Sequence, residues 1–227
     1  NPCGETRSSA DAGTYRVRIV AARPRLLTGE LFNMPGISRD SILSLESYSR
    51  QRNEIRARTI AHKKNRTIHL GDHLTLIFED DVTIRYQIQE MLRAERIFEE
   101  EGIQGELDAY NPLVPDGRNF KATVMIEYED ISERQRQLTL LKGIENKFWV
   151  KVGATDRVWG IADEDLERAN DEKTSAVHFV RFELTKELAE TLKQGAPLAI
   201  GVDHPEYRAS LEPVAANARD SLVKDLV

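Results

Sequence analysis

The feature that most constrains the fold of this chain is a strand–helix–strand pattern that occurs twice in its second half. The first unit comprises a strand over residues 122–129, a helix over 131–142 and a strand over 147–152. The second comprises a strand over residues 176–183, a helix over 184–193 and a strand over 198–202. Both helices end at a glycine, Gly143 or Gly195. Both begin at a hydroxyl N-cap that follows an apolar residue, Ser132 or Thr185.

The two units predict a mixed or antiparallel sheet built from β-α-β units, with both helices on one face. The alternative is that strand–helix–strand order, which is common, occurs twice by chance. Ahead of the units, the expected elements are a helix over residues 41–62 capped by Ser38 or Asp40, a hairpin over 66–79, a helix over 82–101, a short helix over 103–110 and a loop over 111–117. The pattern as a whole predicts an α+β fold.

The first 33 residues differ in composition from the rest. They hold five arginines and three acidic residues, a net charge of 5 − 3 = +2, so the remainder of the chain carries −6 − 2 = −8. We expect residues 1–33 to be an extended or poorly ordered tail, although an added edge strand over residues 14–21 is an alternative. The expected domain then spans residues 34–227, with a mainly helical half over 34–118 and a β-α-β half over 119–227.

Composition excludes several classes of protein. No apolar run approaches the roughly 18 residues needed to cross a bilayer. The single cysteine, Cys3, excludes an internal disulfide, a cysteine-ligated metal and an iron–sulfur cluster. A chain of this size without disulfides is typical of a reducing compartment. We therefore expect a soluble, cytoplasmic protein, and its acidic domain makes nucleic acid and anionic membranes poor partners.

Two ionic residues interrupt predicted apolar helix faces. Glu95 falls near the middle of the stripe formed by Ile84, Ile88, Met91, Leu92 and Phe98. Arg52 has the equivalent place on the preceding helix. An isolated buried charge is costly, so each must have a partner. One interpretation is that Arg52 and Glu95 form a structural salt bridge between the helices; the other is that they line a polar pocket together with His73 and His204.

Histidines could provide a metal site. His69 and His73 flank the predicted turn at Gly71, and with a carboxylate such as Glu95 they could ligate iron, manganese or zinc. The sequence contains neither His-Glu-x-x-His nor Glu-x-x-His spacing, and turn histidines are the more ordinary interpretation.

A run of basic residues lies where the first helix meets the hairpin, and it comprises Arg56, Arg58, Lys63, Lys64 and Arg66. Cations at a helix C-terminus interact favourably with the helix dipole, which is the simpler explanation. Contact with phosphate or nucleic acid is the alternative. No nucleophile elbow, Walker loop or dinucleotide glycine pattern occurs, so the catalytic residues and the cofactors stay unknown.

Several stretches resemble an uncharacterised bacterial family, domain-of-unknown-function family 3501. They are GDHLTLIFE at residues 71–79, QIQEMLRAER at 87–96, LDAYNPLVP at 107–115, ATVMIE at 122–127 and VDHP at 202–205. The resemblance extends from about residue 37 to the C-terminus and implies no established activity. Its members are often encoded beside rubrerythrin and a cysteine-rich iron–sulfur oxidoreductase, which implies a role near peroxide or iron redox chemistry.

The leading functional hypothesis is therefore an accessory protein, not an enzyme, that binds rubrerythrin or the iron–sulfur oxidoreductase through its helical half. One alternative is a metal-dependent or pocket enzyme that uses His73, Glu95, His204 and Arg52. Another is a nucleic-acid-binding regulator that uses the basic run. The oligomeric state is not predicted.

Overall fold

A computed structural model describes residues 36–162 and 174–227, and it confirms the predicted α+β class. The tail predicted over residues 1–33 lies outside the described residues. The helices are η1 (Arg39–Ser41), α1 (Leu45–Lys63), α2 (Asp81–Glu95), α3 (Glu100–Tyr110), η2 (Asn111–Leu113), α4 (Ile131–Leu140), η3 (Ile144–Asn146), α5 (Lys186–Lys193), α6 (Ala216–Leu222) and η4 (Val223–Asp225). Within these ranges, no helix is both long and apolar enough to span a membrane.

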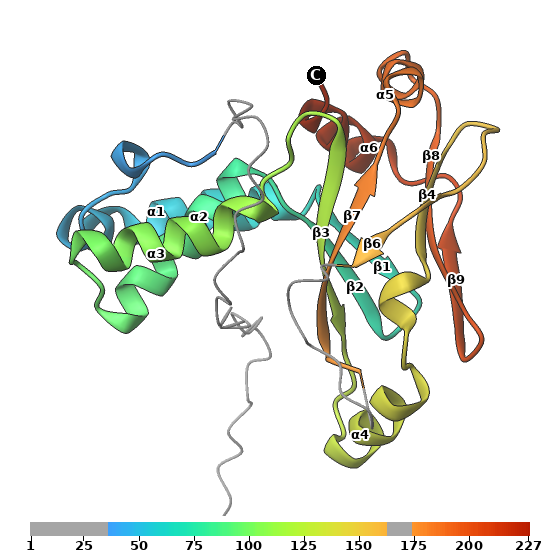
Figure 1. The fold of residues 1–227 in the computed structure, drawn as a ribbon, viewed down its shortest axis with the longest axis horizontal. Coiled ribbons are helices and arrows are strands. Elements are labelled where there is room, and N and C mark those ends of the chain that lie inside the picture. The colour runs from blue at the N-terminus through green and yellow to red at the C-terminus, as the bar shows by residue number, and fades with distance from the viewer. Residues whose placement is uncertain (1–35, 163–173) are drawn as a thin grey trace, which may run out of the picture.

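The strands form two antiparallel sheets (Figure 1). The five-stranded sheet has the order β1 (Thr67–Leu70), β2 (Leu74–Phe78), β3 (Asn119–Ile126), β7 (Val177–Glu183) and β6 (Ile161–Ala162). The four-stranded sheet has the order β5 (Val158–Trp159), β4 (Phe148–Val152), β8 (Leu198–His204) and β9 (Tyr207–Leu211).

The two predicted strand–helix–strand units exist, but each divides its strands between the two sheets. The first strands, β3 and β7, pair in one sheet, and the second strands, β4 and β8, pair in the other. The expectation that both units share one sheet, with both helices on one face, is therefore wrong. An apolar alternation shows which side of a strand is buried, but it carries no information about which strand becomes its neighbour.

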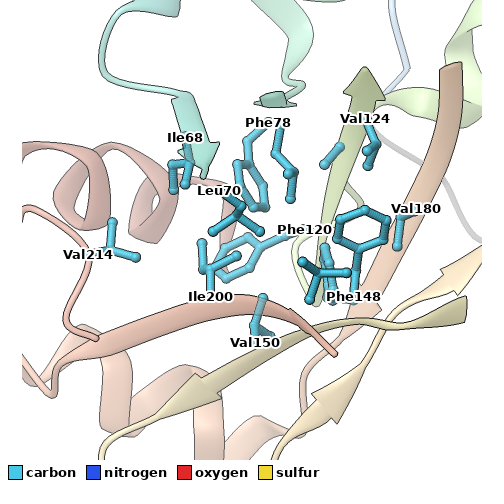
Figure 2. Packing of buried hydrophobic residues seen from close by; sticks show 14 of the residues in the cluster. Ile68, Leu70, Phe78, Phe120, Val124, Phe148, Val150, Val180, Ile200 and Val214 are labelled. Carbon is cyan, nitrogen blue, oxygen red and sulfur yellow. The ribbon is translucent and has the colours of Figure 1, made fainter. Parts of the chain in front are cut away.

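The main core lies between the sheets. Even-numbered residues of β2, β3 and β7 point inward and meet the apolar side of β4 and β8. Figure 2 shows Phe78 and Phe120 approaching Phe148, Val150 and Ile200 from the opposite sheet. Burying a side chain of this size contributes roughly 1.5–3 kcal/mol, so this core is a major source of the stability of the sandwich.

The chain passes directly from one sheet to the other at Gly160. This residue lies between β5, which pairs with β4, and β6, which pairs with β7. Its N–H donates a hydrogen bond of 2.8 Å to the carbonyl of Phe148. A Cβ atom at this position would lie 2.3 Å from Cγ1 of Val180 and 2.9 Å from the ring of Phe182. The corner therefore requires a residue without a side chain.

Replacing Gly160 by alanine should consequently destabilise the protein by about 1–3 kcal/mol through overpacking. Gly105 offers a matched control, because the Cβ that an alanine would add there on α3 would meet nothing within 4 Å beyond the helix's own local backbone and its two chain neighbours. Gly105→Ala should stabilise by up to about 1 kcal/mol, since alanine favours helix more than glycine does. Urea unfolding of both variants provides the comparison, and equal midpoints would contradict the interpretation.

The helical part differs from the prediction in where helices begin and end. α1 begins at Leu45, because the hydroxyl of Ser44 accepts the N–H of Ser47 and caps it, whereas Ser38 precedes the short helix η1. The predicted helix over residues 82–101 ends earlier, at Glu95, because Arg96 adopts a left-handed conformation with φ of 56°. The short helix predicted over residues 103–110 begins at Glu100.

Of the two predicted N-caps of α4 and α5, one is confirmed and one is wrong. Asp130, and not Ser132, caps α4 by accepting the N–H of Glu133. Thr185 caps α5 as predicted, by accepting the N–H of Leu188. Aspartate and serine are equivalent as N-caps, so local preference could not distinguish Asp130 from Ser132.

α1, α2 and α3 lie together beside the five-stranded sheet and extend away from it (Figure 1). Their apolar faces form a second cluster that includes Ile88, Leu92 and Leu107, and Phe179 of β7 joins it from the outer face of that sheet. The three helices thus share a core of their own, and Phe179 connects it to the sandwich. β1 and β2, which the sequence analysis assigned to the helical half, contribute to the core between the sheets instead.

Candidate functional site

A buried carboxylate joins α1 to α2, and it belongs to Glu90. Arg52 of α1 donates to both of its oxygens, Nε at 2.7 Å and Nη2 at 2.8 Å. The hydroxyl of Tyr48, also on α1, donates to the same carboxylate at 2.7 Å. Arg93 adds a longer contact of 3.5 Å from its own helix. Arg52 and Glu90 thus form a bidentate salt bridge, and Tyr48 adds a hydroxyl donor. Bidentate hydrogen bonds between charged groups are among the strongest in proteins.

The titration behaviour of this cluster follows from its burial. Burial opposes ionisation of Glu90, but hydrogen bonds from Arg52, Tyr48 and Arg93 outweigh it and lower the pKa of Glu90 to about 2. Burial and the neighbouring carboxylate raise the pKa of Tyr48. Glu90 is therefore an anion and Tyr48 a neutral donor across the physiological range.

An ionic contact between the two helices exists, as one of the two interpretations predicted, but the partner of Arg52 is not the predicted Glu95. Arg52 contacts Glu90, whereas Glu95 is exposed at the C-terminal end of α2. Phe98, which defined part of the predicted apolar stripe, lies outside the helix and is 70% exposed. Without Phe98, the buried stripe of α2 lies away from Glu95.

A second ionic cluster holds the C-terminus of the described chain against the hairpin and the helices. Arg66 is 1% exposed and its guanidinium is surrounded by acceptors. These are the carbonyls of Phe78, Glu79 and Ser221 and the carboxylates of Asp80 and Asp225. Asp80 also caps α2 and contacts Nε2 of His62 at 2.5 Å. The cluster therefore fixes α1, α2 and η4 to one another.

The five residues of the predicted basic run differ in exposure, so they do not form one basic surface. Arg66 is enclosed as described above, while Arg58 and Lys64 are exposed and Arg56 and Lys63 are partly exposed. Arg58 contacts Glu54 at 3.8 Å, one helical turn away. Contact of the other four residues with phosphate stays a prediction.

The histidines have separate local roles. His204 is buried, and its Nδ1 accepts the N–H of Glu206 while its Nε2 donates to the carbonyl of Lys142. His73 donates from Nδ1 to the carbonyl of Glu127 and stacks on Tyr128 with ring centroids 4.0 Å apart. His69 is exposed, with Nδ1 3.0 Å from the hydroxyl of Thr75.

The predicted pocket residues fall into two groups: Arg52 and Glu95 lie on the helices, whereas His73 and His204 both adjoin Tyr207, whose hydroxyl accepts the N–H of His73 and which pairs with His204. Arg52 is on α1, Glu95 ends α2, His73 is in the β1–β2 turn and His204 ends β8. Within residues 36–162 and 174–227, no three His, Cys, Asp or Glu side chains are grouped so that they could hold a metal ion. The proposed set of His69, His73 and Glu95 is accordingly not assembled in the part that the structure describes.

A different surface, which the sequence reasoning did not single out, lies where α2 meets α3. We call it the acidic corner, and it comprises residues 95–101 with the outer face of α3. Phe98 projects there, 70% exposed. Residues 95–110 hold six acidic residues and one basic residue, so their net charge is 1 − 6 = −5. This density of charge was visible in the sequence, but a continuous helix would not have predicted an exposed phenylalanine within it.

α3 explains why these charges face outward. Its apolar residues Ile103, Leu107 and Tyr110 are buried against the other helices, while Glu101 and Asp108 are exposed on the opposite side. Arg39 neutralises one carboxylate, since its Nε lies 2.9 Å from both oxygens of Glu100. An exposed aromatic side chain within a polar, charged rim is typical of protein interfaces.

Comparison with known proteins bears on the whole described region. The sequence model of a family described as "Protein of unknown function (DUF3501)" matches residues 36–226. Among solved structures, the chain is similar to the crystal structure of a novel protein of unknown function from Burkholderia pseudomallei K96243, with 53% sequence identity and a TM-score of 0.81. That similarity covers 85% of this chain and 100% of the other. No curated protein matches the chain.

Proposed function

Since the chain belongs to the DUF3501 family, as its sequence predicts, and that membership carries no activity, we propose that it is an accessory protein that binds a redox partner through the acidic corner. The observation that carries the proposal is Phe98, a large apolar side chain that is 70% exposed and stands among carboxylates. Aromatic side chains of this kind often dominate the free energy of binding at an interface.

The chemistry of the corner specifies the kind of partner. A net charge of −5 over residues 95–110 complements a basic surface, and the phenyl ring requires an apolar pocket within it. Long-range attraction between such surfaces increases the association rate and weakens as salt is added. We propose rubrerythrin or the cysteine-rich iron–sulfur oxidoreductase as the partner, on the basis of the family resemblance. A cytoplasmic location is part of the same proposal and fits a chain with one cysteine.

Phe98→Ala should weaken binding to the true partner by at least about tenfold, because an interface anchor is lost. Ile131→Ala provides the matched control, since Ile131 is 62% exposed on α4, outside the helical part. Isothermal titration with each purified candidate partner measures both. The wild-type affinity should also fall when ionic strength rises from about 0.05 M to about 0.5 M.

Two results would contradict the proposal. One is that neither candidate partner binds the wild-type protein at low salt. The other is that Ile131→Ala weakens binding as much as Phe98→Ala does, which would place the interface elsewhere. Circular dichroism of both variants distinguishes loss of an interface from loss of fold, and no unfolding is expected because both side chains are mostly exposed.

A further inference from the structure

The outer face of the four-stranded sheet carries an unusual group of side chains. Even-numbered residues of β4 and β8 enter the core, so Trp149 and Gly201 point to the other side, as does Trp159 of β5, which pairs with Trp149. We call this surface the tryptophan face. It lies on the side of the sandwich away from α1, α2 and α3 (Figure 1).

Trp149 has a polar atom without a partner. The residue is 1% exposed and its ring lies over Gly201, where a Cβ atom would be 2.3 Å from Cζ2. Within the described part of the chain, the indole Nε1 is buried and has no hydrogen-bond acceptor. A buried, unsatisfied N–H is energetically costly, and such groups are rare in folded proteins. It can be explained by an acceptor that arrives with a ligand.

Arg157 covers this indole. Its guanidinium lies 4.2 Å from the ring centroid of Trp149 and 5.9 Å from that of Trp159. Nη1 of Arg157 donates to Asp203 at 3.1 Å, and the same carboxylate contacts Nε of Arg208 at 3.0 Å. One carboxylate is therefore shared by two guanidinium groups, which leaves one positive charge in excess.

The charge of the tryptophan face differs in sign from that of the chain. Lys151, Arg157 and Arg208 face outward with Asp203, so the local balance is 3 − 1 = +2, whereas the whole chain carries −6. Trp159 is 47% exposed and provides a planar surface beside these cations. Guanidinium groups bind phosphates well because their donors match the phosphate oxygens.

We propose that the tryptophan face binds a small nucleoside phosphate. The base stacks on the exposed ring of Trp159, and the phosphate is bound by Arg157 and Arg208. Movement of the Arg157 guanidinium toward the phosphate uncovers the indole of Trp149, whose N–H then donates to a ligand oxygen. A small ligand fits better than a long nucleic acid, because the overall charge of −6 repels a polyanion. This inference does not depend on the acidic corner.

The chain offers a selective readout for this proposal. It contains two tryptophans, Trp149 and Trp159, and both lie on this face. AMP should therefore quench the intrinsic tryptophan fluorescence saturably, with a dissociation constant of about 1 mM or tighter. In a ¹⁵N-correlated spectrum of the full chain, the indole N–H signal of Trp149 should shift downfield as it gains an acceptor, and Trp159→Ala assigns the two signals.

Two variants and two partial ligands make the test specific. Arg157→Gln should weaken AMP binding at least tenfold, while Arg136→Gln should not. Arg136 is a suitable control because it too is an exposed arginine paired with a carboxylate, Glu133, at 2.8 Å. Adenosine without phosphate and inorganic phosphate alone should each bind more weakly than AMP.

The outcomes that overturn the proposal are definite. The proposal is wrong if AMP causes no saturable change in fluorescence. It is also wrong if AMP binds wild type and Arg157→Gln equally well. An equal response to phosphate alone or to adenosine alone shows that the ligand class is wrong. Binding that leaves both indole signals unmoved contradicts the role given to Trp149.

Discussion

Replacing Arg66 by methionine is expected to lower the free energy of unfolding by about 3–5 kcal/mol, since removing one partner of a buried ion pair leaves the other charge uncompensated. Methionine retains much of the apolar stem but none of the donors. The carboxylate of Asp225 would lose its guanidinium partner, and the carbonyls of Phe78, Glu79 and Ser221 would lose their side-chain donor.

Urea unfolding followed by circular dichroism measures the change, and Arg58→Met is its control. Arg58 lies on α1 with 78% of its side chain exposed, and its contact with Glu54 is 3.8 Å long, so its loss should cost less than about 0.5 kcal/mol. If Arg66→Met lowers the free energy of unfolding by less than about 1 kcal/mol, the cluster does not hold the C-terminal helices. Leaving a buried carboxylate without its partner would cost more than that.

The second large effect is expected at Glu90. Glu90→Gln should destabilise the protein by about 3 kcal/mol at neutral pH, which is the free energy that corresponds to lowering the pKa from 4.5 to about 2. The folded-state pKa lies below the unfolded value, so this contribution is fully present above pH 4.5 and is lost as the pH falls through about 2. The difference in stability between wild type and variant should therefore be constant above about pH 5 and shrink in acid.

Glu95→Gln is the matched control, because Glu95 is the carboxylate that sequence periodicity selected and it is exposed. Its effect should stay within about 0.5 kcal/mol. A double-mutant cycle with Arg52→Gln should give a coupling energy with Glu90→Gln and none with Glu95→Gln. Coupling of Arg52 with Glu95, and none with Glu90, would show that Glu95 makes the contact between the helices.

The choice between Glu90 and Glu95 shows where sequence reasoning reached its limit. Periodicity correctly indicated that Arg52 needs an anionic partner on the next helix. The two glutamates are five positions apart, which places them about 140° apart around a helix axis. Including Phe98 in the apolar stripe moved its centre toward Glu95, and that inclusion failed because α2 ends at Glu95 and Arg96 turns the chain. A helix end set by one left-handed residue has no periodic signature.

The sequence by itself determined the order of the larger helices and strands as far as β8, whereas it did not indicate β5, β6, β9 or α6. The hairpin around Gly71, the strands of both units and the cap at Thr185 all depend on neighbours within a few residues, so local patterns contain them. The acidic corner was equally present, as an excess of carboxylates over residues 95–110.

Only the tertiary structure decided which distant residues meet. Arg66 and Asp225 are 159 positions apart, and nothing in the spacing of either indicates the other. The same holds for Trp149 lying over Gly201, and for the division of each strand–helix–strand unit between two sheets. Such contacts arise when apolar faces from separate parts of the chain are buried together, and that burial brings particular polar groups side by side without leaving a periodic trace.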